Sequence, residues 1–328
     1  TIAFDEPAYN LSLFHDMPHH ETVLRFSYSS MTTPLTVYDY NLTTGERTQR
    51  KRQEVPSGHD PADYITERLM ATAPDGEQVP ISLLIHKDTP RDGSAPLLLY
   101  GYGSYGISIP ASFNTNRLSL VDRGLVYAIA HIRGGMEKGY GWYRDGKLST
   151  KKNTFTDFIA CAEHLVAQNY TSRGKIAAHG GSAGGMLMGA VANMRPDLFG
   201  AIVADVPFVD VLTTILDDTL PLTPPEWVEW GNPITDESAR AYIASYSPYD
   251  NVAAHDYPAL LITGGISDPR VTYWEPAKWA AKLRAIKTGG DPLFLHINMD
   301  AGHGGKAGRF DRLDEVGRMY AFVLSVFY

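Results

Sequence analysis

The sequence predicts an α/β fold, in which helices cover both faces of a mostly parallel sheet. Two observations support this prediction. From about residue 95, short apolar segments typical of buried strands alternate with longer segments of helical periodicity. The chain has 328 residues, of which 44% are hydrophobic, so it can bury a substantial core and is long enough for about two domains.

The expected elements of this part can be read in order along the chain. The strands cover 96–100, 125–132, 175–179, 201–206, 259–263 and 293–298. The helices cover 117–123, 154–168, 185–194, 274–286 and 313–326. Because parallel strands need long crossover connections, this alternation indicates a parallel sheet rather than a series of hairpins.

The first 60 residues show a different pattern. Segments 23–28 and 35–40 are rich in β-branched and aromatic residues and predict short antiparallel strands. The basic, polar run 47–54, followed by Pro-Ser-Gly at 56–58, is interpreted as a linker. Beyond it, 67–73 and 79–85 flank a Pro-Asp-Gly turn and predict a hairpin. We therefore expect a boundary near residue 60, with one unit over 1–60 and a second over 61–328.

Composition excludes several classes of protein. A net charge of −8 argues against a general nucleic-acid binder, and no apolar stretch is long enough to span a membrane. The chain opens with Thr1 and lacks the features of a secretion signal. Its single cysteine, Cys161, cannot form an intrachain disulfide, which fits a reducing compartment. We therefore expect a cytoplasmic protein.

The acidic residues are concentrated in one segment. Between Arg195 and Arg240 there are nine Asp or Glu residues and no Lys or Arg. Two interpretations remain open at this point: a solvated acidic face, or a cleft whose charge attracts cationic ligands.

A nucleophile motif lies between a strand and a helix. The apolar run 175–179 leads into GGSAGG at 180–185, and a helical segment follows at once. This strand, G-x-S-x-G turn and helix is typical of the nucleophile in α/β-hydrolases. Ser182 is therefore the expected nucleophile, and Gly180 and Gly184 leave room for the neighbouring strand and helix.

A serine nucleophile needs an imidazole base oriented by a carboxylate, in the chain order serine, acid, histidine. His303 lies in a glycine-bracketed loop after the last expected strand and is the expected base. Asp268 follows the strand 259–263 and is the expected acid, with Asp291 and Asp300 in reserve. A turn-forming or helix-capping role for Asp268 is the alternative.

The oxyanion of the tetrahedral intermediate needs hydrogen-bond donors. The backbone N–H of Ala183, directly after the nucleophile, is one expected donor. The second is expected in the loop YGYGSYG at 100–106, where Tyr102 is the first choice and Tyr105 the reserve. The alternative is a Tyr- and Gly-rich turn that only packs under the sheet.

Neither a cofactor nor a metal is expected. His15, His19 and His20 lie in an N-terminal segment without a carboxylate at ligand spacing, so a surface loop is the favoured interpretation. Residues 101–106 match G-x-G-x-x-G, but no helical segment follows directly, which argues against a dinucleotide site.

Several longer motifs together resemble a known family. They are YGYGSYG at 100–106, HIRGG at 131–135, GGSAGG at 180–185, WGNP at 230–233 and YWEPAKW at 273–279. From about residue 60 to the end, the chain resembles the catalytic domain of the prolyl oligopeptidase family of serine peptidases, most closely the oligopeptidase B group.

This resemblance implies specific roles for residues. It implies a triad of Ser182, Asp268 and His303, an oxyanion hole formed by Tyr102 and the Ala183 N–H, and Arg270 as a ligand for a substrate carbonyl. It also implies a seven-bladed β-propeller, of which the first 60 residues resemble only the last strands. The chain is thus expected to be a C-terminal portion whose N-terminal remainder is a partner, and a separate chain for that remainder is one of the open alternatives.

The resemblance further implies cleavage of short peptides after Arg or Lys. Glu226 matches the first acid of the specificity pocket, whereas Val228 stands where a second acid is usual. Residues 109–112 also lack the acids that relatives often carry there. A single pocket acid could favour Arg over Lys, because guanidinium binds a carboxylate through two hydrogen bonds. A prolyl- or acylaminoacyl-type peptidase, an esterase and a non-catalytic interaction module remain as alternatives.

Overall fold

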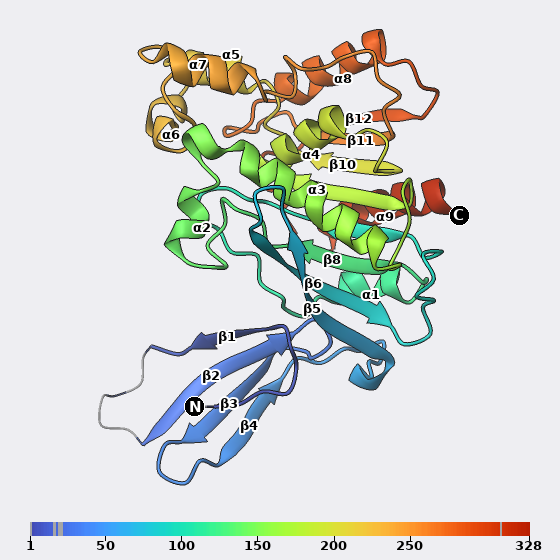
Figure 1. The fold of residues 1–328 in the computed structure, drawn as a ribbon. Coiled ribbons are helices and arrows are strands. Elements are labelled where there is room, and N and C mark those ends of the chain that lie inside the picture. The colour runs from blue at the N-terminus through green and yellow to red at the C-terminus, as the bar shows by residue number, and fades with distance from the viewer. Residues whose placement is uncertain (1, 16–17, 19–21, 309) are drawn as a thin grey trace.

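The computed structural model describes residues 2–15, 18, 22–308 and 310–328. It contains two sheets, and Figure 1 shows the smaller one, in blue, as a layer of its own below the larger. The smaller sheet is antiparallel, in the order β1 (Tyr9–Leu13), β2 (Val23–Ser30), β3 (Thr36–Asn41) and β4 (Arg47–Arg52).

The interpretation of 47–54 and 56–58 as a linker is wrong for residues 47–52. Residues Arg47–Arg52 form the edge strand β4, which pairs with β3. All six side chains of β4 are exposed, so the strand has no buried face and lacks the alternation of apolar and polar residues that marks a strand in sequence.

The larger sheet has eight strands in the order β12-β11-β10-β9-β7-β8-β6-β5. Only the pairs β5–β6 and β6–β8 are antiparallel. This order is that of the α/β-hydrolase fold, as the sequence predicts. The strands are β5 (Tyr64–Thr72), β6 (Gln78–His86), β7 (Leu97–Tyr100), β8 (Val126–Ala130), β9 (Ile176–Gly181), β10 (Ala201–Asp205), β11 (Ala259–Gly265) and β12 (Leu293–Asn298).

Five of the helices match the predicted segments to within about two residues. These are α1 (Thr115–Val121), α3 (Lys152–Ala167), α4 (Ala183–Met194), α8 (Trp274–Ile286) and α9 (Asp311–Phe327). Four further helices were not expected: α2 (Tyr140–Arg144), α5 (Val211–Leu216), α6 (Thr223–Trp230) and α7 (Glu237–Ala244). Each has eight residues or fewer, too short for a clear helical period.

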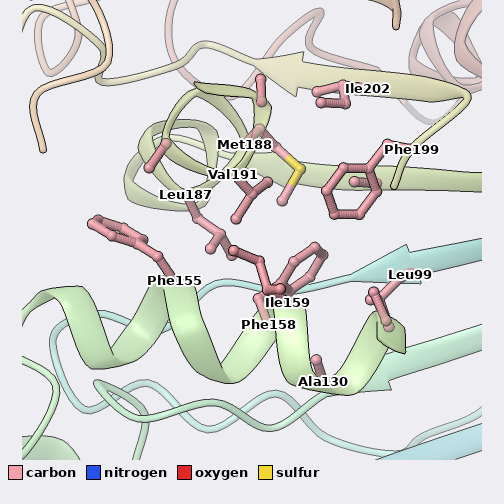
Figure 2. Close-up of a cluster of buried hydrophobic side chains, with 14 of the residues drawn as sticks. Leu99, Ala130, Phe155, Phe158, Ile159, Leu187, Met188, Val191, Phe199 and Ile202 are labelled. Carbon is pink, nitrogen blue, oxygen red and sulfur yellow. The ribbon is translucent and has the colours of Figure 1, made fainter. Parts of the chain in front are cut away.

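Side chains alternate between two cores because successive residues of a strand point to opposite faces. In β7, Leu97 and Leu99 belong to the core that contains α3, α4 and α8. Leu98 belongs to the core on the other face, with residues of α1 and α9. Figure 2 shows Phe155 and Phe158 of α3 pointing toward α4 in the first core.

The structure contains no membrane-spanning helix in the part of the chain that it describes, since none of these helices is long and apolar enough.

Candidate active site

The parallel strands bring four loops from distant parts of the chain to one edge of the sheet. The carboxyl ends of β7, β9, β11 and β12 all lie at this edge. Tyr102 follows β7, Ser182 follows β9, Asp268 follows β11 and His303 follows β12. The sheet topology therefore explains how residues up to about 200 positions apart reach one site.

Ser182 lies on a strained turn. Its φ of 58° and ψ of −120° are rare for a residue with a side chain. Its N–H donates to the Asp205 carbonyl at 2.8 Å, which ties the turn to β10. A Cβ added at Gly180 would lie 2.4 Å from the Gly184 carbonyl oxygen and 2.9 Å from that of Gly101. The glycines of the motif are thus needed for close backbone packing, as predicted.

Asp268 and His303 form a hydrogen-bonded pair. The distance between His303 Nδ1 and Asp268 Oδ2 is 2.7 Å. The other oxygen, Oδ1, accepts the backbone N–H groups of Arg270 and Val271 at 2.8 and 3.0 Å. Burial raises the pKa of Asp268, but the hydrogen bonds from His303 and these amides outweigh it and lower the pKa overall. The aspartate therefore remains charged and orients the imidazole.

Ser182 and Ala183 line a cavity of about 370 Å³ that also contains Tyr102, Glu226 and Arg270. His303 instead lines a neighbouring cavity of about 230 Å³. The hydrogen bonds of the described residues include none between Ser182 and His303. The structure thus joins the acid to the base and gathers the other predicted residues around the serine, and among the described residues no hydrogen bond joins the serine to the base.

The two expected oxyanion donors are available at this cavity. The N–H of Ala183 is the first amide of α4, and among the described residues it has no acceptor. The Tyr102 hydroxyl likewise has no partner within the described part of the chain. Burial, with a contribution from Glu226, raises the pKa of Tyr102 to about 12, so its O–H persists at neutral pH. The hydroxyl of Tyr105, the reserve donor, already donates a hydrogen bond to Glu226 Oε2 at 3.1 Å.

Glu226 lies in the first turn of α6, at the wall of the cavity. Its Oε2 accepts hydrogen bonds from Trp230 Nε1 at 2.8 Å and from the Tyr105 hydroxyl at 3.1 Å. Neither of these bonds involves Oε1. Val228 is 70% exposed and does not line the cavity, so position 228 faces solvent in this chain.

A buried carboxylate that the sequence analysis missed lies one position further on. Glu229 is 2% exposed and accepts the N–H of Tyr105 at 2.9 Å and the hydroxyl of Tyr143 at 2.5 Å. In the sequence, the one feature that pointed to Glu229 was its place among the nine acids between Arg195 and Arg240. Only the fold brings α6 against the Tyr105 loop.

A second His-Asp pair lies behind the nucleophile. His179 Nε2 is 2.8 Å from Asp205 Oδ2, and Thr263 donates to Asp205 Oδ1 at 2.9 Å. Both members of the pair line the smaller cavity with His303. Since the Asp205 carbonyl also accepts the N–H of Ser182, this pair supports the nucleophile turn.

The remaining candidates lie elsewhere. Asp291 and Asp300 are exposed, and neither bonds to His303. His19 and His20 fall outside the described residues, and no group of three metal-binding side chains occurs among those described.

The acidic segment does not form one cleft. Of its nine acids, Glu226 alone lines the cavity of Ser182. Asp197 pairs with Arg195, Asp210 pairs with Lys278, and Asp236 caps α7. Of the nine acids in the segment, only Glu226 is therefore placed to attract a cation at this cavity.

Comparison with known proteins gives two matches to family models. Residues 111–328 match the prolyl oligopeptidase family, and residues 1–53 match the N-terminal β-propeller domain of prolyl oligopeptidases.

Individual proteins match nearly the whole chain. Dipeptidyl aminopeptidase BI from Pseudoxanthomonas mexicana is 52% identical over 99% of this chain and 45% of its own length. Oligopeptidase B from Leishmania major is 46% identical with a TM-score of 0.94, over 99% of this chain and 46% of that one. Oligopeptidase B from Trypanosoma brucei, in a closed form with covalently bound antipain, is 48% identical with the same TM-score and the same coverage. The chain therefore spans about half the length of the relatives it matches.

Proposed function

This chain belongs to the prolyl oligopeptidase family, and from that premise we propose that it is the catalytic part of a serine peptidase that cleaves short peptides after Arg or Lys. The observation that carries the proposal is the shared cavity of Ser182 and Glu226. A strained nucleophile and a carboxylate with one oxygen free of hydrogen bonds face the same space there.

The proposed mechanism begins with proton transfer. His303 Nε2 accepts the proton of Ser182, and the serine Oγ attacks the carbonyl carbon of the scissile bond. Asp268 keeps the proton of the imidazole on Nδ1, so that Nε2 can accept. Since no hydrogen bond joins serine and base here, the imidazole must approach the hydroxyl, and such bonds often tighten only in the substrate complex.

The following steps use the other groups of the cavity. The Tyr102 hydroxyl and the Ala183 N–H donate to the oxyanion of the tetrahedral intermediate. The imidazolium then protonates the leaving amine, and an acyl-enzyme on Ser182 remains. Water attacks the acyl-enzyme with His303 again as the base, which releases the acid product and restores the serine.

Two residues are proposed to bind the substrate. Glu226 Oε1 accepts a hydrogen bond from the cationic side chain that precedes the scissile bond. Such a bond between a cation and a carboxylate is stronger than one between neutral groups. Glu226 Oε2 already accepts two hydrogen bonds, which disfavours two-point binding of guanidinium and weakens the case for Arg over Lys. Arg270 is exposed at the cavity and is proposed to donate to a substrate backbone carbonyl.

We also propose a domain boundary near residue 60 and a propeller as the partner of the catalytic part. The match of residues 1–53 to the propeller model supports this. The four-stranded sheet ends at Arg52, and the first strand of the larger sheet begins at Tyr64.

The proposal predicts two separable effects in the complete protein, propeller included. Ser182→Ala is expected to lower hydrolysis of an Arg-amide by at least ~10³-fold, because it removes the nucleophile. Glu226→Gln is expected to lower kcat/KM for Arg- and Lys-amides by about 10- to 100-fold and to leave a neutral ester substrate nearly unchanged. Steady-state kinetics and labelling by a serine-directed phosphonate measure both. Full activity of Ser182→Ala, or equal loss on all substrates for Glu226→Gln, would contradict the respective role.

A second candidate is the release of dipeptides from the N-terminus of a substrate. It is favoured by the 52% identity with dipeptidyl aminopeptidase BI. A dipeptidyl-Arg amide with a free N-terminus and the same compound with a blocked N-terminus separate the two functions. Cleavage of the free form alone would support the aminopeptidase, and cleavage of both the endopeptidase.

A further inference from the structure

Two buried charged groups hold the loop that follows the proposed oxyanion donor. Lys151 is 0% exposed, and its Nζ donates to the Gly103 carbonyl at 2.6 Å and to Ser104 Oγ at 2.9 Å. Glu229, on the other side, accepts the N–H of Tyr105 at 2.9 Å. Three successive residues of one loop are thus each bound by a buried Lys or Glu.

The loop needs such support because its backbone is strained. Gly103, Tyr105 and Gly106 all have positive φ angles, of 75°, 57° and 67°. Of these three residues, Tyr105 has the greatest backbone strain, because a residue with a side chain disfavours the left-handed region. A Cβ added at Gly103 would lie 2.4 Å from Thr154 Cγ2, so the loop also packs closely against α3.

Burying two ionisable groups costs folding free energy unless each is paired and hydrogen-bonded. Burial lowers the pKa of Lys151 to about 7, although Glu229 acts in the opposite direction. Besides the loop, the Lys151 ammonium donates, among the described residues, only to the Gly146 carbonyl, at 3.3 Å, and it faces the rings of Trp230 at 5.2 Å and Phe155 at 6.0 Å. Most of its hydrogen bonds are therefore directed at the loop.

The loop carries the groups on which the proposed catalysis depends. Tyr102 directly precedes the bound segment and offers its hydroxyl to the cavity of Ser182. Tyr105, within the segment, donates its hydroxyl to Glu226. A shift of the segment would therefore move the oxyanion donor, whereas Glu226 lies on α6, outside the loop.

We propose that Lys151 and Glu229 act as positioning residues, a buried clamp that fixes residues 103–105 and thereby aims Tyr102 at the oxyanion. This inference rests on the proposed function, because it assigns the clamp to the same reaction. It differs from the role of Glu226, since the clamp does not contact the substrate. Its loss should therefore affect every substrate alike.

The test compares Lys151→Met and Glu229→Gln with Tyr102→Phe in the complete protein. The clamp variants are expected to lower kcat about 10- to 100-fold on both an Arg-amide and a neutral ester, with KM changed less than about 3-fold. Combined with Tyr102→Phe, either variant should add less than its separate effect, because both act through one hydroxyl. Lys175→Met and Glu237→Gln are matched controls, because both side chains are exposed and neither contacts the loop, and they should keep wild-type kcat.

A further variant keeps the proposal testable if Lys151→Met or Glu229→Gln fails to fold. Tyr143→Phe removes one hydrogen bond to Glu229 without a change in buried charge, and it should lower kcat about 3- to 10-fold on both substrates with an unchanged thermal midpoint. Wild-type kcat in folded clamp variants, or effects fully additive with Tyr102→Phe, would overturn the clamp. If Ser182→Ala retains activity, the proposed function fails instead, so the two failures are distinct.

Discussion

Ser182 adopts a backbone conformation that its own side chain disfavours, and glycines around it make the turn possible. At Gly180 an added Cβ would collide with backbone atoms of Gly184 and Gly101, which cannot rotate away. At Gly181, the nearest atoms would be the Asp205 carbonyl oxygen at 3.4 Å and its Cβ at 3.5 Å, an ordinary contact. Two adjacent glycines of the motif thus have different steric requirements.

We predict that Gly180→Ala destabilises the fold by about 3 kcal/mol or more, because backbone must shift to admit the methyl group. Gly181→Ala, its neighbour, should cost less than about 1 kcal/mol. Urea unfolding followed by circular dichroism measures both free energies of unfolding. Similar values for the two variants would show that the close approach at Gly180 is not limiting.

At the scale of elements, a single carboxylate holds three strands of the small sheet together. Asp39 on β3 accepts Arg25 Nε of β2 at 2.6 Å and Arg50 Nε of β4 at 2.7 Å. The hydrogen bond from Arg25 is the largest cause that lowers the pKa of Asp39, to about 2. Because the pKa is lower in the folded state, the charged form stabilises the sheet above about pH 4, and this contribution is lost as the pH falls toward 2.

We predict that Asp39→Asn lowers the free energy of unfolding at pH 7 by about 1 kcal/mol, a modest value because both arginines are partly exposed and screened by solvent. The difference from wild type should shrink between pH 4 and pH 2. Urea unfolding at several pH values is the measurement, with the exposed Asp5→Asn as control. A difference that stays constant across this range would exclude the ion pairs as its cause.

At the scale of the whole molecule, the two sheets share a buried contact. Met31, at the end of β2, is 1% exposed and belongs to the same apolar cluster as Ala111 and the residues of α1. The Phe113 N–H also donates to Ser29 Oγ at 2.9 Å. The small sheet is therefore anchored on the segment that follows the Tyr105 loop.

We predict that Met31→Ala lowers the free energy of unfolding by about 2–4 kcal/mol, because it leaves a cavity at this contact. It should also increase the rate at which protease cleaves between the sheets, near residues 53–60. Limited proteolysis and thermal unfolding test this, with Leu42→Ala, whose side chain is 59% exposed, as control. An unchanged cleavage rate would show that Met31 does not couple the sheets.

Much of this architecture could be predicted from local patterns. The strand and helix that flank Ser182 are long and apolar, so their period is clear in the sequence. β1, β4 and the short helices α2 and α5 to α7 were missed, because an exposed strand has no apolar alternation and a helix of about two turns or fewer has almost no period. Tertiary contacts, rather than local propensity, stabilise these elements.

The sequence by itself determined which residues are proposed for the chemistry of the site, because a turn that exposes a serine needs glycines at set positions and a strand and helix at its ends. Only the tertiary structure decided which groups contact one another: that Asp268 binds His303, that Val228 faces solvent, and that Lys151 and Glu229 are buried against one loop. The physical reason is that local spacing governs a turn, whereas a contact between distant residues depends on how whole elements pack. In sequence alone, Lys and Glu side chains are expected to face water, and only the packing of distant elements around Lys151 and Glu229 buries them.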